Sequence, residues 1–211
     1  DLIANNYAMS FNGTDQYVDT SVTPAQLGFP ATTVNEGSFS ISFWYNHNSI
    51  SNLMPIIQST TNYAWNDGFG IRQEVSLGSN KLRFWVGNQT HSAVTGGVPD
   101  SSKWYHIACV FTGGSTYTLK IYINGSLANT TSKTTSYNIH NTQNISMAWA
   151  DDGYPYYFNG SLDEVAIFNK PLSLSEIQLI YNATVNNPGE TANLFTAGLN
   201  NSLVYWNRMG D

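Results

Sequence analysis

Apolar and polar residues alternate with a period of two along most of the chain, in short runs bounded by Gly, Asn, Pro and Ser. The clearest run is 39–45, where Phe39, Ile41, Phe43 and Tyr45 fall on one face of a strand. The same pattern predicts further strands over 7–11, 17–19, 54–58, 69–74, 81–86, 105–111, 117–123, 145–149 and 162–168. Many short strands at hairpin spacing, with almost no helix, predict an antiparallel β-sandwich.

Glycine-containing dipeptides predict the turns between these strands. Gly113-Gly114 is placed to join 105–111 to 117–123, and Asn124-Gly125 predicts a tight turn with positive φ. Asn159-Gly160 predicts another turn, just before the last strand of the series.

One helix is predicted, over 173–181. Ser173 is a good N-cap residue, and Glu176 three positions later completes a capping box. Residues 183–199 are rich in Asn, Thr, Gly and Pro and predict a linker, followed by a strand-like run over 203–211. We therefore divide the chain into a sandwich over 1–182 and a tail over 183–211. The tail is either a lead-in to a following module or an extra strand packed on this sandwich.

Composition narrows the possible functions. Only 10% of residues are charged and the net charge is −6, without clusters of Lys and Arg, which argues against nucleic-acid binding. No apolar run has the length of a membrane span, so membrane insertion is not expected. The single cysteine, Cys109, excludes a disulfide framework and favours a small buried residue. The chain opens at Asp1, so we expect a piece of a longer protein.

Five segments, taken in order, resemble the concanavalin A-like superfamily in its laminin G-like and pentraxin-like branch. They are 9–18, 39–44, 104–108, 121–125 and 158–168. The resemblance implies a two-sheet jelly-roll β-sandwich with one short C-terminal helix. It also implies a module of a larger extracellular, cell-surface or virion-surface protein, with neighbouring modules of the same polypeptide as partners and a possible homo-oligomer.

The same resemblance implies a structural calcium ion where the turn after the first strand meets the last strand. Asn12 and Asp15 in that turn, with Asp163 in the late strand, are the candidate ligands, since calcium prefers hard oxygen atoms. The alternative is that Asp163 is an ordinary residue at a strand entry.

A second candidate site lies in two acidic loops, Trp65-Asn66-Asp67 and Trp149-Ala150-Asp151-Asp152. The family's pentraxin side implies that such loops converge on calcium and ligand, so Asn66, Asp67, Asp151 and Asp152 are candidate ligands. The aromatic residues around them would suit stacking on a sugar ring. The candidate ligand-binding residues are Trp65, Asn66, Asp67, Trp149, Asp151, Asp152, Tyr154 and Tyr156. Both loops are also good turn sequences, which is the alternative.

The remaining tryptophans and the histidines are expected to be structural. Trp44, Trp85 and Trp104 are predicted to fill the core or cover a sheet. The four histidines have no close metal-ligand spacing and are expected in strands or loops.

Catalysis is not expected. The glucanases of the resembled family carry alternating acids along one strand, because two carboxylates must flank the glycosidic bond. This chain has the adjacent pair Asp163-Glu164, which strict alternation places on opposite faces. The leading hypothesis is a non-catalytic module that binds a glycan or glycoprotein with the help of calcium. The alternatives are a structural or oligomerising module with no small ligand and, less favoured, a glycoside hydrolase.

Overall fold

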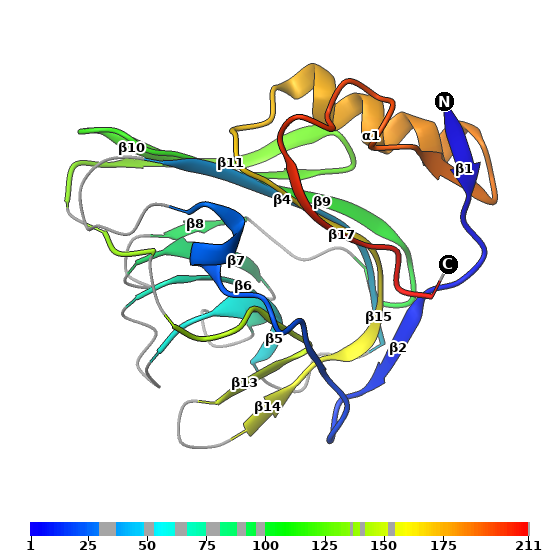
Figure 1. The fold of residues 1–211 in the computed structure, drawn as a ribbon. Coiled ribbons are helices and arrows are strands. Elements are labelled where there is room, and N and C mark those ends of the chain that lie inside the picture. Colours follow the sequence, from blue (N-terminus) through cyan, green and yellow to red (C-terminus); the bar gives the residue numbers. More distant parts are fainter. Residues whose placement is uncertain are drawn as a thin grey trace.

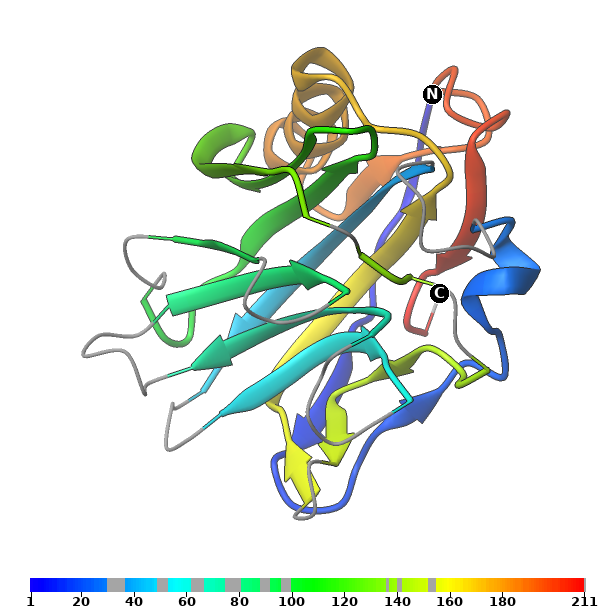
Figure 2. The same cartoon turned by 90° about the vertical axis from the view of Figure 1, so that its left-hand side faces the viewer.

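The structure is a computed structural model that describes residues 1–29, 37–48, 53–61, 67–74, 81–87, 92–95, 100–135, 137–139, 142–151 and 155–210. Two antiparallel sheets pack face to face and form a β-sandwich, as the alternation predicts (Figure 1). Figure 2 shows the smaller of the two sheets in front of the larger one.

The larger sheet has seven strands in the order β11-β10-β9-β4-β15-β17, with β2 also paired to β15. Their bounds are β2 Met9–Asn12, β4 Ser38–His47, β9 Tyr105–Thr112, β10 Tyr117–Ile123, β11 Ser126–Lys133, β15 Asn159–Phe168 and β17 Leu203–Asn207.

The smaller sheet has six strands in the order β3-β12-β5-β6-β7-β8. Their bounds are β3 Val18–Asp19, β5 Met54–Ser59, β6 Phe69–Glu74, β7 Lys81–Val86, β8 Ser92–Val94 and β12 Ser146–Met147. Two further pairs join β1 Leu2–Ala4 to β16 Glu190–Ala192 and β13 Trp149–Asp151 to β14 Pro155–Tyr157, and a short 3-10 helix spans Pro24–Leu27.

The main core lies between the two sheets. Phe39, Ile41, Phe43 and Tyr45 of β4 are almost fully buried in it, which confirms the face predicted from alternation. Phe39 is at its centre and contacts aromatic rings on several elements, including Phe29 at 4.7 Å between centroids. Such ring contacts add to the stabilisation from buried apolar area.

A second apolar cluster lies on the outer face of the larger sheet, under α1 (Leu174–Asn186). The Ser173 hydroxyl accepts a hydrogen bond from the Glu176 amide and the Glu176 carboxylate accepts one from the Ser173 amide, so the capping box is confirmed. The helix ends at Asn186 rather than near Tyr181, because one more turn, including Ala183, packs on this cluster. No helix in the described ranges is long and apolar enough to cross a membrane.

The turn predictions have mixed outcomes. The β9–β10 hairpin forms across Gly113-Gly114, and Asn124 and Gly125 both adopt positive φ between β10 and β11. Gly160, by contrast, lies inside β15 rather than in a turn, so that prediction was wrong. A Cβ atom there would lie 2.2 Å from the Asn46 carbonyl oxygen, so glycine is needed for the close approach of β4.

The C-terminal tail lies against the sandwich. β17 pairs with β15, with Asn207 opposite Val165, and β16 pairs with β1. Leu194 and Leu199 between these strands are buried in the second cluster. In this structure β17 is therefore an edge strand of the larger sheet.

Candidate functional site

The two acidic loops predicted from the sequence are described only in part. Trp65, Asn66, Asp152 and Tyr154 lie outside the described residues, and only the backbone of Asp151, at the end of β13, is described. The structure does place Asp67, Trp149 and Tyr156.

The Asp67 carboxylate, just before β6, is hydrogen-bonded to the residues that follow β5. It accepts hydrogen bonds from the Thr60 hydroxyl and the Thr61 amide, both at 2.8 Å, and from the Thr61 hydroxyl. Trp149 is half-buried, and its ring lies 5.5 Å from that of Tyr17, which is 52% exposed. Tyr156 is half-buried opposite Ala150 in the β13–β14 hairpin. These contacts suit turn formation, and they also leave an aromatic pair beside the first turn of the chain.

The three candidate ligands of a structural calcium do not converge. The Asn12 side chain forms a local turn in which it accepts from the Thr14 and Asp15 amides and donates to the Asp15 carboxylate at 2.7 Å. Asn12 lies opposite Asn159 on β15, and Asp163 is four residues further along, about 13 Å away at the usual rise per residue. Within the part of the chain that the structure describes, no three His, Cys, Asp or Glu side chains form a group suited to a metal ion.

Asp163 and Glu164 flank a β-bulge rather than following strict alternation. The register with β4 shifts between Asp163 and Ala166, and Glu164 has a φ of 51°. Glu164 accepts hydrogen bonds from Trp206 Nε1 at 2.7 Å and from Arg208 Nε at 3.2 Å. Since Trp206 packs on the cluster under α1 and Asp163 lies beside α1 residues, both acids are on the helix side of the sheet. The prediction of opposite faces was wrong, because an inserted residue breaks the period of two.

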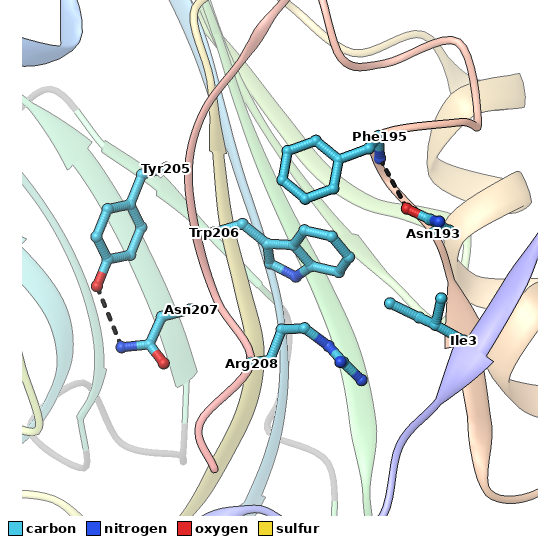
Figure 3. Close-up of a pocket in the computed structure, with 7 residues that line it drawn as sticks. All are labelled: Ile3, Asn193, Phe195, Tyr205, Trp206, Asn207 and Arg208. Atoms are coloured by element: carbon cyan, nitrogen blue, oxygen red, sulfur yellow. Dashed lines mark hydrogen bonds between the residues drawn. The ribbon is translucent and has the colours of Figure 1, made fainter. Parts of the chain in front are cut away.

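The bulge supports a surface pocket at the edge of the larger sheet. Figure 3 shows this pocket, which has a volume of about 560 Å³ and which we call the Phe195 pocket. Its lining residues come from β1, from the turn after β16 and from β17 with the residue that follows it. They are Ile3, Asn193, Phe195, Tyr205, Trp206, Asn207 and Arg208.

Two aromatic rings form the apolar part of the Phe195 pocket. Phe195 is 63% exposed and meets Trp206 edge-on, with 5.2 Å between ring centroids. The Arg208 guanidinium lies 5.7 Å from the Trp206 ring, and the Asn193 carboxamide fixes the loop by accepting from the Phe195 amide at 3.1 Å. Because Glu164 already accepts from Trp206 Nε1, the indole ring is held in one orientation before any ligand arrives.

The sequence did not identify these residues as a site, because the position of the tail was left open between a lead-in and an extra packed strand. Two signals were present: Phe195 is an aromatic residue within a stretch rich in Asn, Thr and Gly, and Trp206 falls in an apolar, strand-like run. Neither signal shows that the tail folds back on β15, since strand pairing over a long sequence separation leaves no local pattern.

The tryptophans, the cysteine and the histidines that were predicted to be structural have different outcomes. Trp44 and Trp85 are buried, as expected, whereas Trp104 is 42% exposed. Cys109 is buried, and burial raises the pKa of its thiol. His47 and His106 are buried in strands, while His91 and His140 lie outside the described residues.

The fold, with its two sheets and covering helix, is that of a lectin-like β-sandwich. Residues 12–178 match the family model of the concanavalin A-like lectin/glucanases superfamily. The chain therefore belongs to this superfamily, in agreement with the laminin G-like resemblance of its motifs. No curated protein sequence matched the chain.

Solved structures share the fold at low sequence identity. A heptameric SAP-like pentraxin from Limulus polyphemus is 17% identical with a TM-score of 0.56, over 82% of this chain and 80% of that one. The sialidase CBM40 of Ruminococcus gnavus, bound to α2,3-sialyllactose, is 16% identical with a TM-score of 0.60, over 82% and 95%. The binding domain of botulinum neurotoxin DC, in complex with SialylT, is 19% identical with a TM-score of 0.56, over 86% of this chain but only 46% of that one.

Proposed function

We propose that this protein is a non-catalytic glycan-binding module and that the Phe195 pocket is its sugar-binding site. The observation that carries the proposal is a 63% exposed Phe195 packed against a fixed Trp206 at the wall of a 560 Å³ pocket. Such a pocket is within the size range of small-ligand sites. We further propose that the chain is a module of a larger protein that acts outside the cell or on a virion surface.

The chemistry of the pocket suits a sugar. An exposed ring can stack on the C–H face of a pyranose, and amide and guanidinium groups can hydrogen-bond its hydroxyls. Asn193 and Arg208 supply such groups next to the two rings. Because the Glu164 contact fixes Trp206, little side-chain freedom is lost on binding.

The similar structures support the class of ligand. The Ruminococcus module was solved with a sialylated lactose and the neurotoxin domain in complex with SialylT. The carboxylate of an acidic sugar would favour the Arg208 side of the pocket, whose charge is shared with Glu164. We therefore place both neutral and sialylated glycans in the test.

Calcium assistance is a separate part of the proposal. We propose that Asp67, Asp151 and Asp152 in the two acidic loops hold a calcium ion that supports ligand binding beside Tyr17 and Trp149. The support is the oxygen-rich chemistry of these loops and the aromatic pair next to them. If calcium in these loops is required for glycan binding, binding is lost on chelation with EDTA and restored by added calcium.

A glycan array followed by titration of the best ligand tests the proposal. Phe195→Ala is expected to weaken binding by about tenfold, the loss of one ring contact. Tyr7→Ala removes a similarly exposed aromatic residue outside both the pocket and the acidic loops and is expected to leave binding unchanged. Loss of binding in Tyr17→Ala but not in Phe195→Ala moves the site to the acidic loops. No glycan binding at all favours the alternative of a structural or oligomerising module.

A further inference from the structure

A second pocket, of about 290 Å³, lies between the outer face of the larger sheet and the C-terminal end of α1. We call it the Trp104 pocket. Trp44 of β4 and Trp104, just before β9, supply two indoles, and Asp163 of β15 supplies a carboxylate. The pocket is lined by Asn5, Trp44, Trp104, Asp163, Thr184 and Val185.

The two tryptophans differ in their surroundings. Trp44 is 8% exposed and its ring is stacked on Tyr181 of α1 at 5.9 Å between centroids. Trp104 is 42% exposed, although burying so large an apolar ring would lower the free energy of the folded protein. The pocket thus has one fixed indole in its wall and one indole that is available to a ligand.

Two polar atoms of the lining residues lack partners. Trp44 Nε1 and Asn5 Oδ1 are buried and have no hydrogen-bond partner in the part of the chain that the structure describes. A buried donor or acceptor without a partner costs free energy, so natural structures rarely retain one without a reason. One atom is a donor and the other an acceptor.

Asp163 determines which way the Asn5 side chain points. The Asn5 Nδ2 group donates to the Asp163 carboxylate at 3.0 Å, and an ionised carboxylate can only accept. The carboxamide is therefore held with its nitrogen toward Asp163 and its oxygen turned away. The Asn5 amide nitrogen donates to the Gly189 carbonyl at 2.8 Å, which holds the backbone too. Asp163 acts here as a positioning residue.

These features select a ligand that carries hydroxyl groups. A hydroxyl can accept from Trp44 Nε1 and donate to Asn5 Oδ1, whereas an ammonium group can only donate and leaves the indole N–H unpaired. The volume is at the lower end of the range for small-ligand sites, which corresponds to one sugar ring. The exposed Trp104 ring supplies a stacking surface.

We propose that the Trp104 pocket binds a single neutral sugar ring, as a second site that is separate from the Phe195 pocket. The proposal does not depend on the function of the Phe195 pocket, since the two pockets share no lining residue. In this proposal Asp163 has no role in catalysis and instead positions the Asn5 side chain for ligand recognition.

Titration with methyl glycosides of neutral hexoses, followed by NMR of the six tryptophan indole N–H groups, tests the proposal. The signal that disappears in Trp44→Phe identifies Trp44 Nε1. It is expected to shift on titration with at least one glycoside, with a dissociation constant in the millimolar range. Trp104→Ala is expected to weaken this binding by about tenfold, and Trp104→Phe to restore most of it. Asn5→Ala is expected to weaken it as well.

Phe195→Ala is the matched control, because it removes an exposed ring from the other pocket and is expected to leave the Trp44 shift unchanged. If Phe195→Ala abolishes glycan-array binding while the Trp44 shift persists, both sites exist. If no glycoside moves the Trp44 signal, or if tetramethylammonium moves it and the glycosides do not, the Trp104 pocket is not a sugar site. Loss of array binding alone contradicts only the Phe195 proposal. Thermal unfolding of each variant distinguishes a binding defect from a folding defect.

Discussion

Close packing around single residues explains why some positions require a particular residue type that the alternating pattern does not predict. Gly70 of β6 lies under the fully buried Trp85 of β7, and a Cβ atom at Gly70 would lie 2.1 Å from the indole ring. The Arg72 guanidinium covers the same ring at 5.0 Å. The indole therefore takes the space that any other side chain at position 70 would need.

Gly70→Ala is expected to lower the free energy of unfolding by about 1–3 kcal/mol, the usual cost of overpacking a core. Urea unfolding followed by far-UV circular dichroism measures it. In a Trp85→Phe background the smaller ring leaves room, so the same glycine substitution is expected to cost less. An equal cost in both backgrounds would show that contact with the indole is not the cause.

His106 gives the clearest expected dependence of folding stability on pH. It is fully buried, its Nε2 lies 2.8 Å from the Ser42 hydroxyl, and burial lowers its pKa to about 3. The unfolded chain takes up this proton near pH 6.5 and the folded chain does not, so stability is complete above about pH 6.5 and falls toward pH 3. The expected slope is about 1.4 kcal/mol per pH unit.

Urea unfolding at several pH values between 6.5 and 5 measures this slope. Glu176, whose pKa is partly raised by burial but lowered overall by hydrogen bonds from Lys170 and Ser173, begins to contribute only at lower pH. His106→Gln is expected to flatten the curve in this window, whatever its effect on stability at pH 7. An unchanged slope in His106→Gln would assign the proton uptake to another group.

At the scale of elements, the β-bulge at Glu164 connects β15 to the C-terminal strand. The Glu164 carboxylate is 5% exposed and accepts from both Trp206 and Arg208, and Arg208 also donates to the Ala4 carbonyl oxygen. One acidic side chain thereby ties β17 and the N-terminal segment to the sheet.

Glu164→Gln keeps the size of the side chain but removes its charge, so the pair with Arg208 is lost. We expect a loss of about 1–3 kcal/mol, because the partner guanidinium stays largely buried. Hydrogen exchange is expected to rise over 203–207 and not over 105–112. Lys103→Gln, which breaks an exposed ion pair with Asp100, is the control and is expected to change neither stability nor exchange.

The same elements show how far the sequence determines the structure. Hairpins and the capped helix were predictable, because Gly113-Gly114, Asn124-Gly125 and Ser173 act through local backbone chemistry. The bulge at Glu164 and the strand position of Gly160 were not, since both depend on how β4 lies against β15. The candidate sites were also predictable only in part. Aromatic and acidic residues were identified by type. The Phe195 and Trp104 pockets were not predictable, because each combines residues more than 150 positions apart.

At the scale of the whole molecule, the two ends of the chain complete the outer layer of the sandwich. β1 pairs with β16, and β17 extends the larger sheet beyond β15 (Figure 1). The second cluster includes Leu194 and Leu199 from the tail beside Phe168 and Ile177. The tail therefore pairs with β1 and β15 and packs on the second cluster.

Truncation after Asn187 tests whether the tail is needed for folding. It removes β16 and β17, exposes one edge of β15 and uncovers the second cluster, so the loss should be several kcal/mol. For a domain of this size that corresponds to a fall in Tm of about 10 °C or more. Scanning calorimetry measures the fall, and a fluorescent probe of exposed apolar surface should bind the truncated chain but not the full one. A lead-in that serves only a following module contributes nothing to this domain, so an unchanged Tm would identify the tail as such a segment.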